Sequence, residues 1–277
     1  MRDRTNPHSH VGGQHSHAES IGHFVAIDGE AEMLAAARQN FRAGATQLKL
    51  ATNGGISAIY SPLDIDQFTD SELAAAAFVT ESFGSYFMVH AYYDNAVSRA
   101  IEFGAKSIEH GHLMTEKVIR QMAREDVYLV VEALMSTSDA PPSFTADQRE
   151  KFELAKSGFV EMIELAKKHD LKIAFGSDVF LSKDAYALQS MEWVARSEFF
   201  TPVENLRQAT SIGGEILALS GPRSRYKEGP LGVIKPGAYA DLLLIDGEPL
   251  NDIKILADPD SNLRLIMKDG VIYKNTL

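Results

Sequence analysis

The chain contains no cysteine among its 277 residues. Disulfide bonds and thiolate metal sites are therefore excluded, so a transition-metal site would have to use histidine, carboxylate or a less usual ligand. No apolar stretch approaches the ~20 residues that a membrane-spanning helix needs. The first residues are polar and rich in histidine, without the apolar core of a secretory signal. These absences favour a cytoplasmic protein with no membrane partner.

Positive charge is also scarce. The chain has 27 Lys and Arg residues against 38 Asp and Glu residues, which gives a formal net charge of −11. This balance argues against a nucleic acid or an anionic membrane as partner. Apolar residues make up 45% of the chain, and its length suits one barrel-sized domain or a domain with an appendage.

Helix-like and strand-like segments alternate along most of the chain. The expected helices cover residues 31–43, 70–83, 95–103, 115–125 and 146–169. Gly44, Gly84 and Gly104 follow the first three as stop signals, and Thr69 or Asp70 is an expected N-cap. A short apolar run follows each helix, as expected of buried parallel strands. The alternation predicts βα units and a parallel sheet.

The pattern changes near Gly221. From residue 229 onward, short β-rich runs are punctuated by Pro-Gly and Asp-Gly pairs, which are hairpin-turn signals. Residues 268–270 (KDG) followed by residues 271–273 (VIY) predict one such hairpin. We therefore expect a barrel-type domain over residues 1–220 and a small β segment over residues 221–277.

Four of the apolar runs end in chemically capable side chains, namely Lys49, His90, His110 and Asp178. In a β/α barrel the carboxyl ends of the strands meet at one rim, and catalytic groups lie there. Taken singly, each residue has a simpler explanation: a surface lysine, a hydrogen-bonded histidine or a helix-capping aspartate. Together, at four strand ends, they favour a metal-dependent hydrolase.

The chemistry of this set explains the lysine. Burial lowers the pKa of a lysine amine, and the neutral amine of Lys49 can then react with carbon dioxide to give a carbamate, an oxygen ligand able to bridge two cations. His90 and His110 would supply imidazole nitrogen. Metal binding lowers the pKa of water towards ~7, and Asp178 would act as general base and then general acid. The expected cofactors are one or two divalent ions, with zinc as the expected metal, and carbon dioxide as carbamate on Lys49.

Several motifs resemble the amidohydrolase superfamily. Residues 231–252 (LGVIKPGAYADLLLIDGEPLND) are similar to the segment that closes its β-sandwich. Residues 49–55 (KLATNGG), 90–92 (HAY) and 108–111 (IEHG) resemble its imidazolonepropionase-like branch, which includes Xaa-Pro dipeptidases. The resemblance covers nearly the whole chain from about residue 12.

This resemblance implies a role for each member of the set. It implies a carboxylated Lys49, with His90, His110 and Asp178, around one or two divalent metal ions. It also implies that Tyr92 contacts the scissile carbonyl. The implied reaction is hydrolysis of an amide or peptide C–N bond in a small molecule or short peptide, either a proline-containing peptide or a cyclic amide.

The chain also departs from the family pattern. Family members begin with sandwich strands and a first barrel strand that ends in His-x-His. The pairs His8/His10 and His15/His17 have this spacing, but neither follows an apolar strand. The stretch Gly12-Gly13-Gln14-His15 instead resembles a Gly-Gly-His stretch of the family, which makes His15 a candidate for substrate binding.

The expected fold is therefore α/β: an incomplete TIM-type (β/α) barrel with a small C-terminal β-sandwich segment. The missing strands leave an open edge, and open edges invite association, including homo-oligomers. Two alternatives stay open beside the hydrolase. One is a truncated, non-catalytic amidohydrolase-like domain. The other is a metal-free aldolase with Lys49 as a Schiff base, which leaves His90, His110 and Asp178 without roles.

Overall fold

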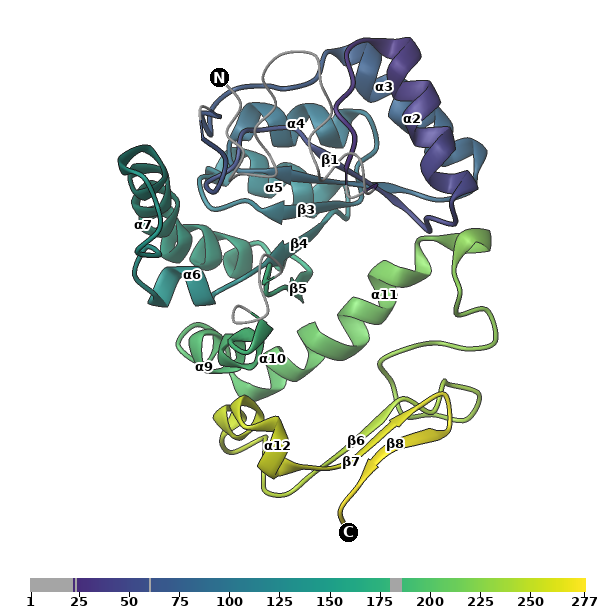
Figure 1. The fold of residues 1–277 in the computed structure, drawn as a ribbon, viewed down its shortest axis with the longest axis vertical. Helices are drawn as coiled ribbons and strands as arrows, with labels where there is room; N and C mark the ends of the chain where they lie inside the picture. Colours follow the sequence, from purple (N-terminus) through teal and green to yellow (C-terminus); the bar gives the residue numbers. More distant parts are fainter. Residues whose placement is uncertain (1–21, 23, 60, 180–185) are drawn as a thin grey trace. The chain divides into compact units, whose positions relative to one another are not determined.

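A computed structural model of the chain describes residue 22 and residues 24–59, 61–179 and 186–277. The chain divides into two compact units (Figure 1). The first comprises Met1–Leu129 and Asp139–Leu171, and the second comprises Val130–Ser138 and Lys172–Leu277.

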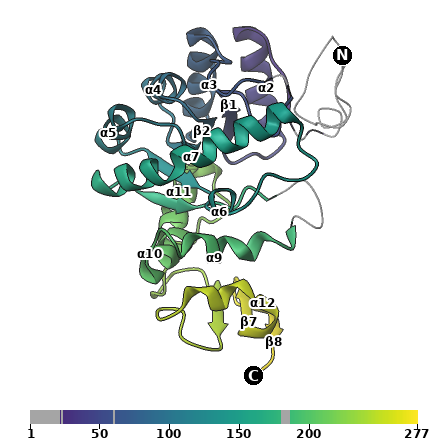
Figure 2. The same ribbon diagram turned by 90° about the vertical axis from the view of Figure 1, so that its left-hand side faces the viewer.

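The first unit is built from βα repeats. Its elements are α2 (Glu30–Arg42), β1 (Leu48–Ala51), α3 (Asp70–Ser82), β2 (Phe87–Ala91), α4 (Asp94–Glu102), β3 (Ser107–His110), α5 (Glu116–Arg124) and α7 (Ala146–Lys168). The helices α2 and α3 pack side by side, and α3 and α4 pack on β2 (Figure 1). The long helix α7 packs against α5 (Figure 2). Strand β4 (Tyr128–Val131) crosses from the first unit into the second.

The second unit combines short helices with a small sheet. Its elements are α6 (Leu134–Thr137), β5 (Ile173–Phe175), η1 (Gln189–Met191), α9 (Glu192–Arg196), α10 (Pro202–Arg207), η2 (Gln208–Ile212), α11 (Gly213–Ala218), η3 (Gly221–Arg223), β6 (Leu242–Ile245), η4 (Ile253–Ala257), α12 (Pro259–Asn262), β7 (Leu263–Lys268) and β8 (Val271–Asn275). The elements α10, η2 and α11 follow one another without a gap, and η2 is a π-helical turn.

Local sequence signals explain where the helices begin and end. Thr69 closes a capping box at the start of α3, as predicted. Gly44, Gly84 and Gly104 have φ values of 97°, 64° and 93°. Glycine adopts this left-handed conformation without steric cost, and it ends a helix. The predicted stop signals are therefore confirmed.

Five strands form one sheet in the order β1-β2-β3-β4-β5, and β1 pairs with β2, and β2 with β3, in parallel. The parallel sheet expected from the alternation is confirmed. Along β2, Phe87, Val89 and Ala91 are buried, whereas Met88 and His90 are only partly buried. One face of the sheet is thus covered by helices, and the other carries the chemically capable residues.

The predicted end of the first strand is wrong. We expected the first strand to end at Lys49, but β1 continues to Ala51. The pairings of Leu50 with Val89 and of Ala51 with His90 continue the ladder beyond the lysine. Lys49 is therefore the second residue of its strand rather than the last.

The C-terminal strands β6, β7 and β8 form an antiparallel sheet, and Asp269-Gly270 makes the turn of the predicted hairpin. Leu243, Leu244 and Tyr273 are exposed on this sheet. Among the residues that the structure describes, no helix is both long and apolar enough to cross a membrane.

The start of α7 gives a direct test of the capping argument. The Thr145 hydroxyl accepts from the Gln148 N–H at 3.3 Å, and the Gln148 side chain accepts from the Thr145 N–H at 2.9 Å. We expect Thr145→Ala to lower the free energy of unfolding by about 1 kcal/mol in denaturant titrations. Ser157→Ala, which removes an exposed hydroxyl from the middle of the same helix, is the control. Equal effects of the two substitutions would contradict the capping role.

Candidate active site

His90 and His110 come together at the carboxyl ends of β2 and β3. His90 pairs with Ala51 on one side and with Glu109 on the other, so it belongs to the less buried face of the sheet. His110 pairs with Ala91, whose side chain lies on the helix-covered face. A regular strand would send the His110 ring to that face too.

A left-handed backbone redirects His110. Its φ is 75°, a conformation that costs a non-glycine residue about 1–3 kcal/mol. As a result, the His110 ring meets the His90 ring edge-on, with centroids 4.5 Å apart. Such strain is characteristic of functional sites, where surrounding structure holds the residue in place.

Tyr92 completes this group, and we call His90, Tyr92 and His110 the ring cluster. The Tyr92 ring stacks on His110 at 5.3 Å and meets His90 edge-on at 5.0 Å. Behind it, the buried His112 contacts Tyr92 and also Phe159 of α7. The structure thus brings together three of the residues predicted from the sequence.

The loop after β1 holds one side of the ring cluster. The Gly54 carbonyl lies 2.9 Å from Nε2 of His90. A side chain at Gly54 would place its Cβ 2.1 Å from the Pro62 carbonyl oxygen, so only glycine fits there. Asn53, 1% exposed, accepts the Tyr92 N–H at 2.8 Å.

The donor set of the ring cluster fits a divalent metal ion. When Nε2 of His90 donates to the Gly54 carbonyl, a metal ion would be bound through Nδ1, and such carbonyl partners commonly orient metal-binding histidines. His110 lies close enough to supply a second imidazole. Within the described part of the chain, no group of three or more His, Asp, Glu or Cys residues is arranged to hold a metal ion. Among the described residues, a third protein ligand would therefore have to be of another kind.

Lys49 would provide such a ligand only as a carbamate. Lys49 pairs with Met88, which precedes His90 by two residues in β2. Alternate residues of a strand face the same way, so the Lys49 side chain lies on the same face of the sheet as His90 but further from the carboxyl ends of the strands. Lys49 is exposed on the edge strand of the described sheet.

Glu109 shares this face with His90, and its charge acts on a buried phenol, Tyr86. Glu109, the register partner of His90, accepts the Ser107 hydroxyl at 2.8 Å. Burial and the nearby charge of Glu109 raise the pKa of Tyr86 well above its ordinary value. Tyr86 is therefore neutral at physiological pH.

Asp178 belongs to the second unit. It follows β5 by three residues, is exposed, and has a left-handed backbone with φ of 48°. Aspartate tolerates this conformation better than most residues. His15, the predicted substrate-binding residue, lies outside the described residues.

The sequence of this chain matches a known protein family over nearly its whole length. The family model described as the amidohydrolase family matches residues 4–273. The chain belongs to the amidohydrolase family. The predicted resemblance to the superfamily is confirmed, and the βα sheet is accordingly part of a TIM-type barrel.

Two solved structures are similar to this amidohydrolase. A prolidase crystallised with N-methylphosphonate-L-proline is 30% identical, with a TM-score of 0.81 over 90% of this chain and 60% of its own. A Xaa-Pro dipeptidase with methionine bound in its active site is 27% identical, with a TM-score of 0.77 over 90% of this chain and 59% of its own.

An ochratoxinase from Aspergillus niger is also similar. It is 24% identical over 264 residues, which cover 91% of this chain and 51% of the ochratoxinase. The amidohydrolase chain thus spans about half the length of this curated relative and about 60% of the two solved structures.

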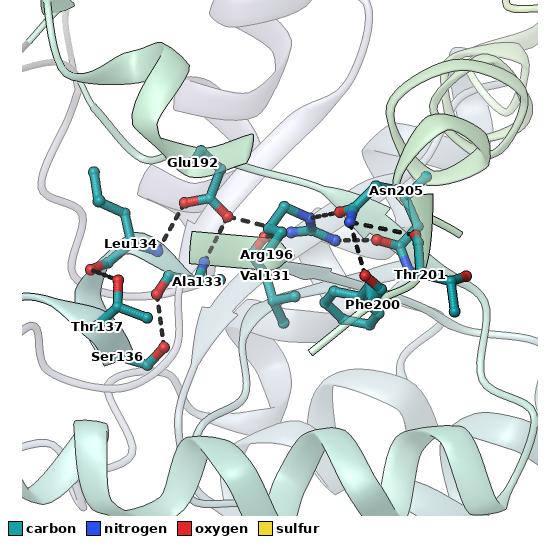
Figure 3. A network of polar contacts seen from close by, with 11 residues as sticks. Val131, Ala133, Leu134, Ser136, Thr137, Glu192, Arg196, Phe200, Thr201 and Asn205 are labelled. Carbon is teal, nitrogen blue, oxygen red and sulfur yellow. Dashed lines mark hydrogen bonds and ion pairs between the residues drawn. The ribbon is translucent and has the colours of Figure 1, made fainter. Parts of the chain in front are cut away.

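A buried ion pair in the second unit supports the loop after β4 (Figure 3). Glu192 and Arg196 stand one helical turn apart on α9 and are both fully buried. The Glu192 carboxylate accepts the N–H groups of Ala133 and Leu134 at 2.6 and 2.8 Å. It thereby fixes the loop that follows β4.

Arg196 holds the ends of β4 and β5. Its guanidinium donates to the Val131 carbonyl at 2.7 Å and to the Asn205 side chain at 3.1 Å. It also lies over the ring of Phe175, the last residue of β5, at 4.7 Å. Burial raises the pKa of Glu192 and lowers the pKa of Arg196, and the attraction between the two opposes both shifts.

Sequence reasoning missed these supporting residues. The four-residue spacing of Glu192 and Arg196 is a signal for an ion pair on one helix face. The His-x-His spacing of His110 and His112 was also visible. No sequence signal marked Asn53, because its partners lie 12 to 40 residues away.

The buried pair Glu192–Arg196 is expected to contribute strongly to the stability of the fold. Removing one partner of such a pair leaves an uncompensated buried charge, so Arg196→Met should lower the free energy of unfolding by about 3–5 kcal/mol. Arg124→Met removes an exposed arginine that pairs with Glu125, and its effect should stay within about 0.5 kcal/mol. Denaturant titration measures both, and a cost for Arg196→Met as small as that for Arg124→Met would contradict the structural role.

Proposed function

We propose that this amidohydrolase is a metal-dependent enzyme that hydrolyses the C–N bond of an amide or short peptide. The ring cluster carries the proposal, because two imidazoles and a phenol meet at the carboxyl ends of parallel strands. In a β/α barrel this is the edge where catalytic groups lie. Family membership supports the same class of reaction.

Each residue has a part in the proposed reaction. A divalent metal ion, with zinc as the proposed metal, would be held by His90, His110 and a carbamate of Lys49, and would supply an acidified water and an electrophile. The Tyr92 hydroxyl donates a hydrogen bond to the substrate carbonyl oxygen as negative charge develops there. From the family resemblance alone, Asp178 is proposed as the group that takes a proton from the attacking water and delivers it to the leaving amine as the C–N bond breaks.

The proposed substrate is a dipeptide with proline in the second position. A prolidase 30% identical to this chain was crystallised with a phosphonate analogue of proline, and a Xaa-Pro dipeptidase is also similar. The similarity to an ochratoxinase supports a substrate other than a dipeptide as the second candidate. We therefore propose a small, proline-containing peptide first and a non-peptide amide second, with neither nucleic acid nor membrane as partner.

A non-catalytic role is the competing proposal. Lys49 is exposed, whereas carbamate formation requires a neutral amine, which burial would favour. The chain also covers about 60% of its structural relatives. The position of β1 at the edge of the described sheet and the exposed apolar residues of β6–β8 favour association with another chain, including a homo-oligomer.

Metal content and hydrolysis of a Xaa-Pro dipeptide panel separate the two proposals. The hydrolase proposal predicts that the zinc-loaded chain is active in bicarbonate-containing buffer, that a chelator abolishes activity, and that added zinc restores it. Lys49→Ala should abolish turnover, while Lys106→Ala, which removes another exposed lysine, should not. Absence of turnover under every metal tested would favour the non-catalytic domain.

The histidine-rich N-terminus complicates zinc measurements, because His8, His10, His15 and His17 are themselves potential ligands. Total zinc content alone is therefore not enough, and two forms of the chain have to be compared. If the ring cluster binds zinc, the double substitution His90→Ala/His110→Ala should lower bound zinc relative to the unsubstituted chain. Unchanged zinc content in this variant would show that the ring cluster is not the metal site.

Tyr92 has a separate test. If its hydroxyl stabilises the developing oxyanion, Tyr92→Phe should lower kcat by about 10²–10³-fold, as loss of one oxyanion donor does. Tyr273→Phe removes a hydroxyl from an exposed tyrosine of β8 and should leave kcat unchanged. Steady-state kinetics measure kcat for both variants. A normal kcat for Tyr92→Phe would show that the Tyr92 hydroxyl does not stabilise the oxyanion.

A further inference from the structure

We infer that Asn53 is a positioning residue that sets both Tyr92 and His90 in the ring cluster. The inference rests on the proposed hydrolase function for its kinetic consequence, but its structural content stands apart from activity. Asn53 lies in the loop after β1, and its side chain is buried. All the contacts that carry the inference lie within the first unit.

The side-chain oxygen of Asn53 fixes the backbone that carries Tyr92. Oδ1 accepts the Tyr92 N–H at 2.8 Å and the Tyr93 N–H at 3.1 Å. These two residues follow the end of β2 and precede α4, so they lie between two regular elements. Buried backbone N–H groups need a partner, and Asn53 provides one for both.

The rest of Asn53 is tied to the following segment of the same loop. Nδ2 donates to the Ile65 carbonyl at 2.7 Å, and the Gln67 side chain donates to the Asn53 carbonyl. The Gln67 N–H donates to the Thr52 carbonyl at 2.9 Å. The side chain therefore has little freedom, as accurate positioning of another group requires.

The neighbours of Asn53 in sequence hold His90. Thr52 donates its N–H and its hydroxyl to the His90 carbonyl, each at 3.0 Å. The Gly54 carbonyl lies 2.9 Å from Nε2 of the His90 ring. Residues 52–54 thus hold His90 at its backbone and ring and Tyr92 at its backbone, and the contacts of Asn53 with Ile65 and Gln67 fix the middle of this run.

Asparagine suits this place because its amide offers an acceptor and donors in one plane. Aspartate would keep the acceptor for Tyr92 and Tyr93 but lose the donor to Ile65. Alanine would lose both. Asn53→Asp therefore tests the contact with the loop at Ile65 alone, whereas Asn53→Ala also removes the contacts that position Tyr92 and Tyr93.

The experiment compares Asn53→Ala, Asn53→Asp and the control Asn40→Ala, which alters an exposed asparagine of α2. Amide hydrogen exchange is followed by NMR at Tyr92 and Tyr93, and kcat and KM are measured on a Xaa-Pro dipeptide. Asn53→Ala should speed exchange at both amides and lower kcat by about 10–100-fold, as disturbance of the groups around a metal site commonly does, with KM changed by less than about threefold. Asn53→Asp should keep the Tyr92 and Tyr93 amides protected from exchange and should lower kcat less than Asn53→Ala does. Asn40→Ala should match the unsubstituted chain in both measurements.

Several results would overturn the inference. These are unchanged exchange at Tyr92 and Tyr93 in Asn53→Ala, a loss confined to KM, or equal losses of protection in Asn53→Ala and Asn53→Asp. If Asn53→Ala does not fold, the unsubstituted chain still decides, because unprotected amides at Tyr92 and Tyr93 would contradict the hydrogen bonds. If the unsubstituted chain shows no hydrolysis, the proposed function fails while the exchange results still test the role of Asn53.

Discussion

The parallel pairing of β1, β2 and β3 is the constraint on which the site depends. It places Lys49, His90 and Glu109 on one face of the sheet and the buried side chains of Phe87, Val89 and Ala91 on the other. A shift of one residue in the register of β2 would turn His90 into the helix-covered core. His110 is the exception, since a left-handed backbone turns its ring towards His90.

Buried polar groups then hold the strand ends in position, and each unit does this in its own way. In the first unit, the amide of Asn53 and the carbonyl of Gly54 bind the residues that end β2. In the second unit, the Glu192–Arg196 pair binds the backbone at the end of β4 (Figure 3). Each set satisfies backbone groups where the regular ladder stops, which is where a barrel enzyme needs accurate geometry.

Much of the fold could be predicted from periodicity, because helix stops and hairpin turns are local. Gly84 and Gly104 ended their helices as predicted, and Asp269-Gly270 formed its turn. The end of β1 was misplaced, because strand length depends on the pairing partner rather than on local sequence. Partners of the site residues, such as Asn53, could not be predicted either, since their contacts span tens of residues. The structure brings His90, Tyr92 and His110 together. Their predicted roles, like those of Lys49, Asp178 and His15, stay predictions.

In the proposed site, His90 and His110 bind a metal ion beside Tyr92. X-ray absorption spectroscopy at the zinc edge tests this most directly on the zinc-loaded chain. We predict a ligand shell with two imidazoles that loses imidazole scattering in His90→Ala/His110→Ala. A spectrum that is the same in the variant and the unsubstituted chain would contradict it, because the zinc would then be held elsewhere, for example by the N-terminal histidines.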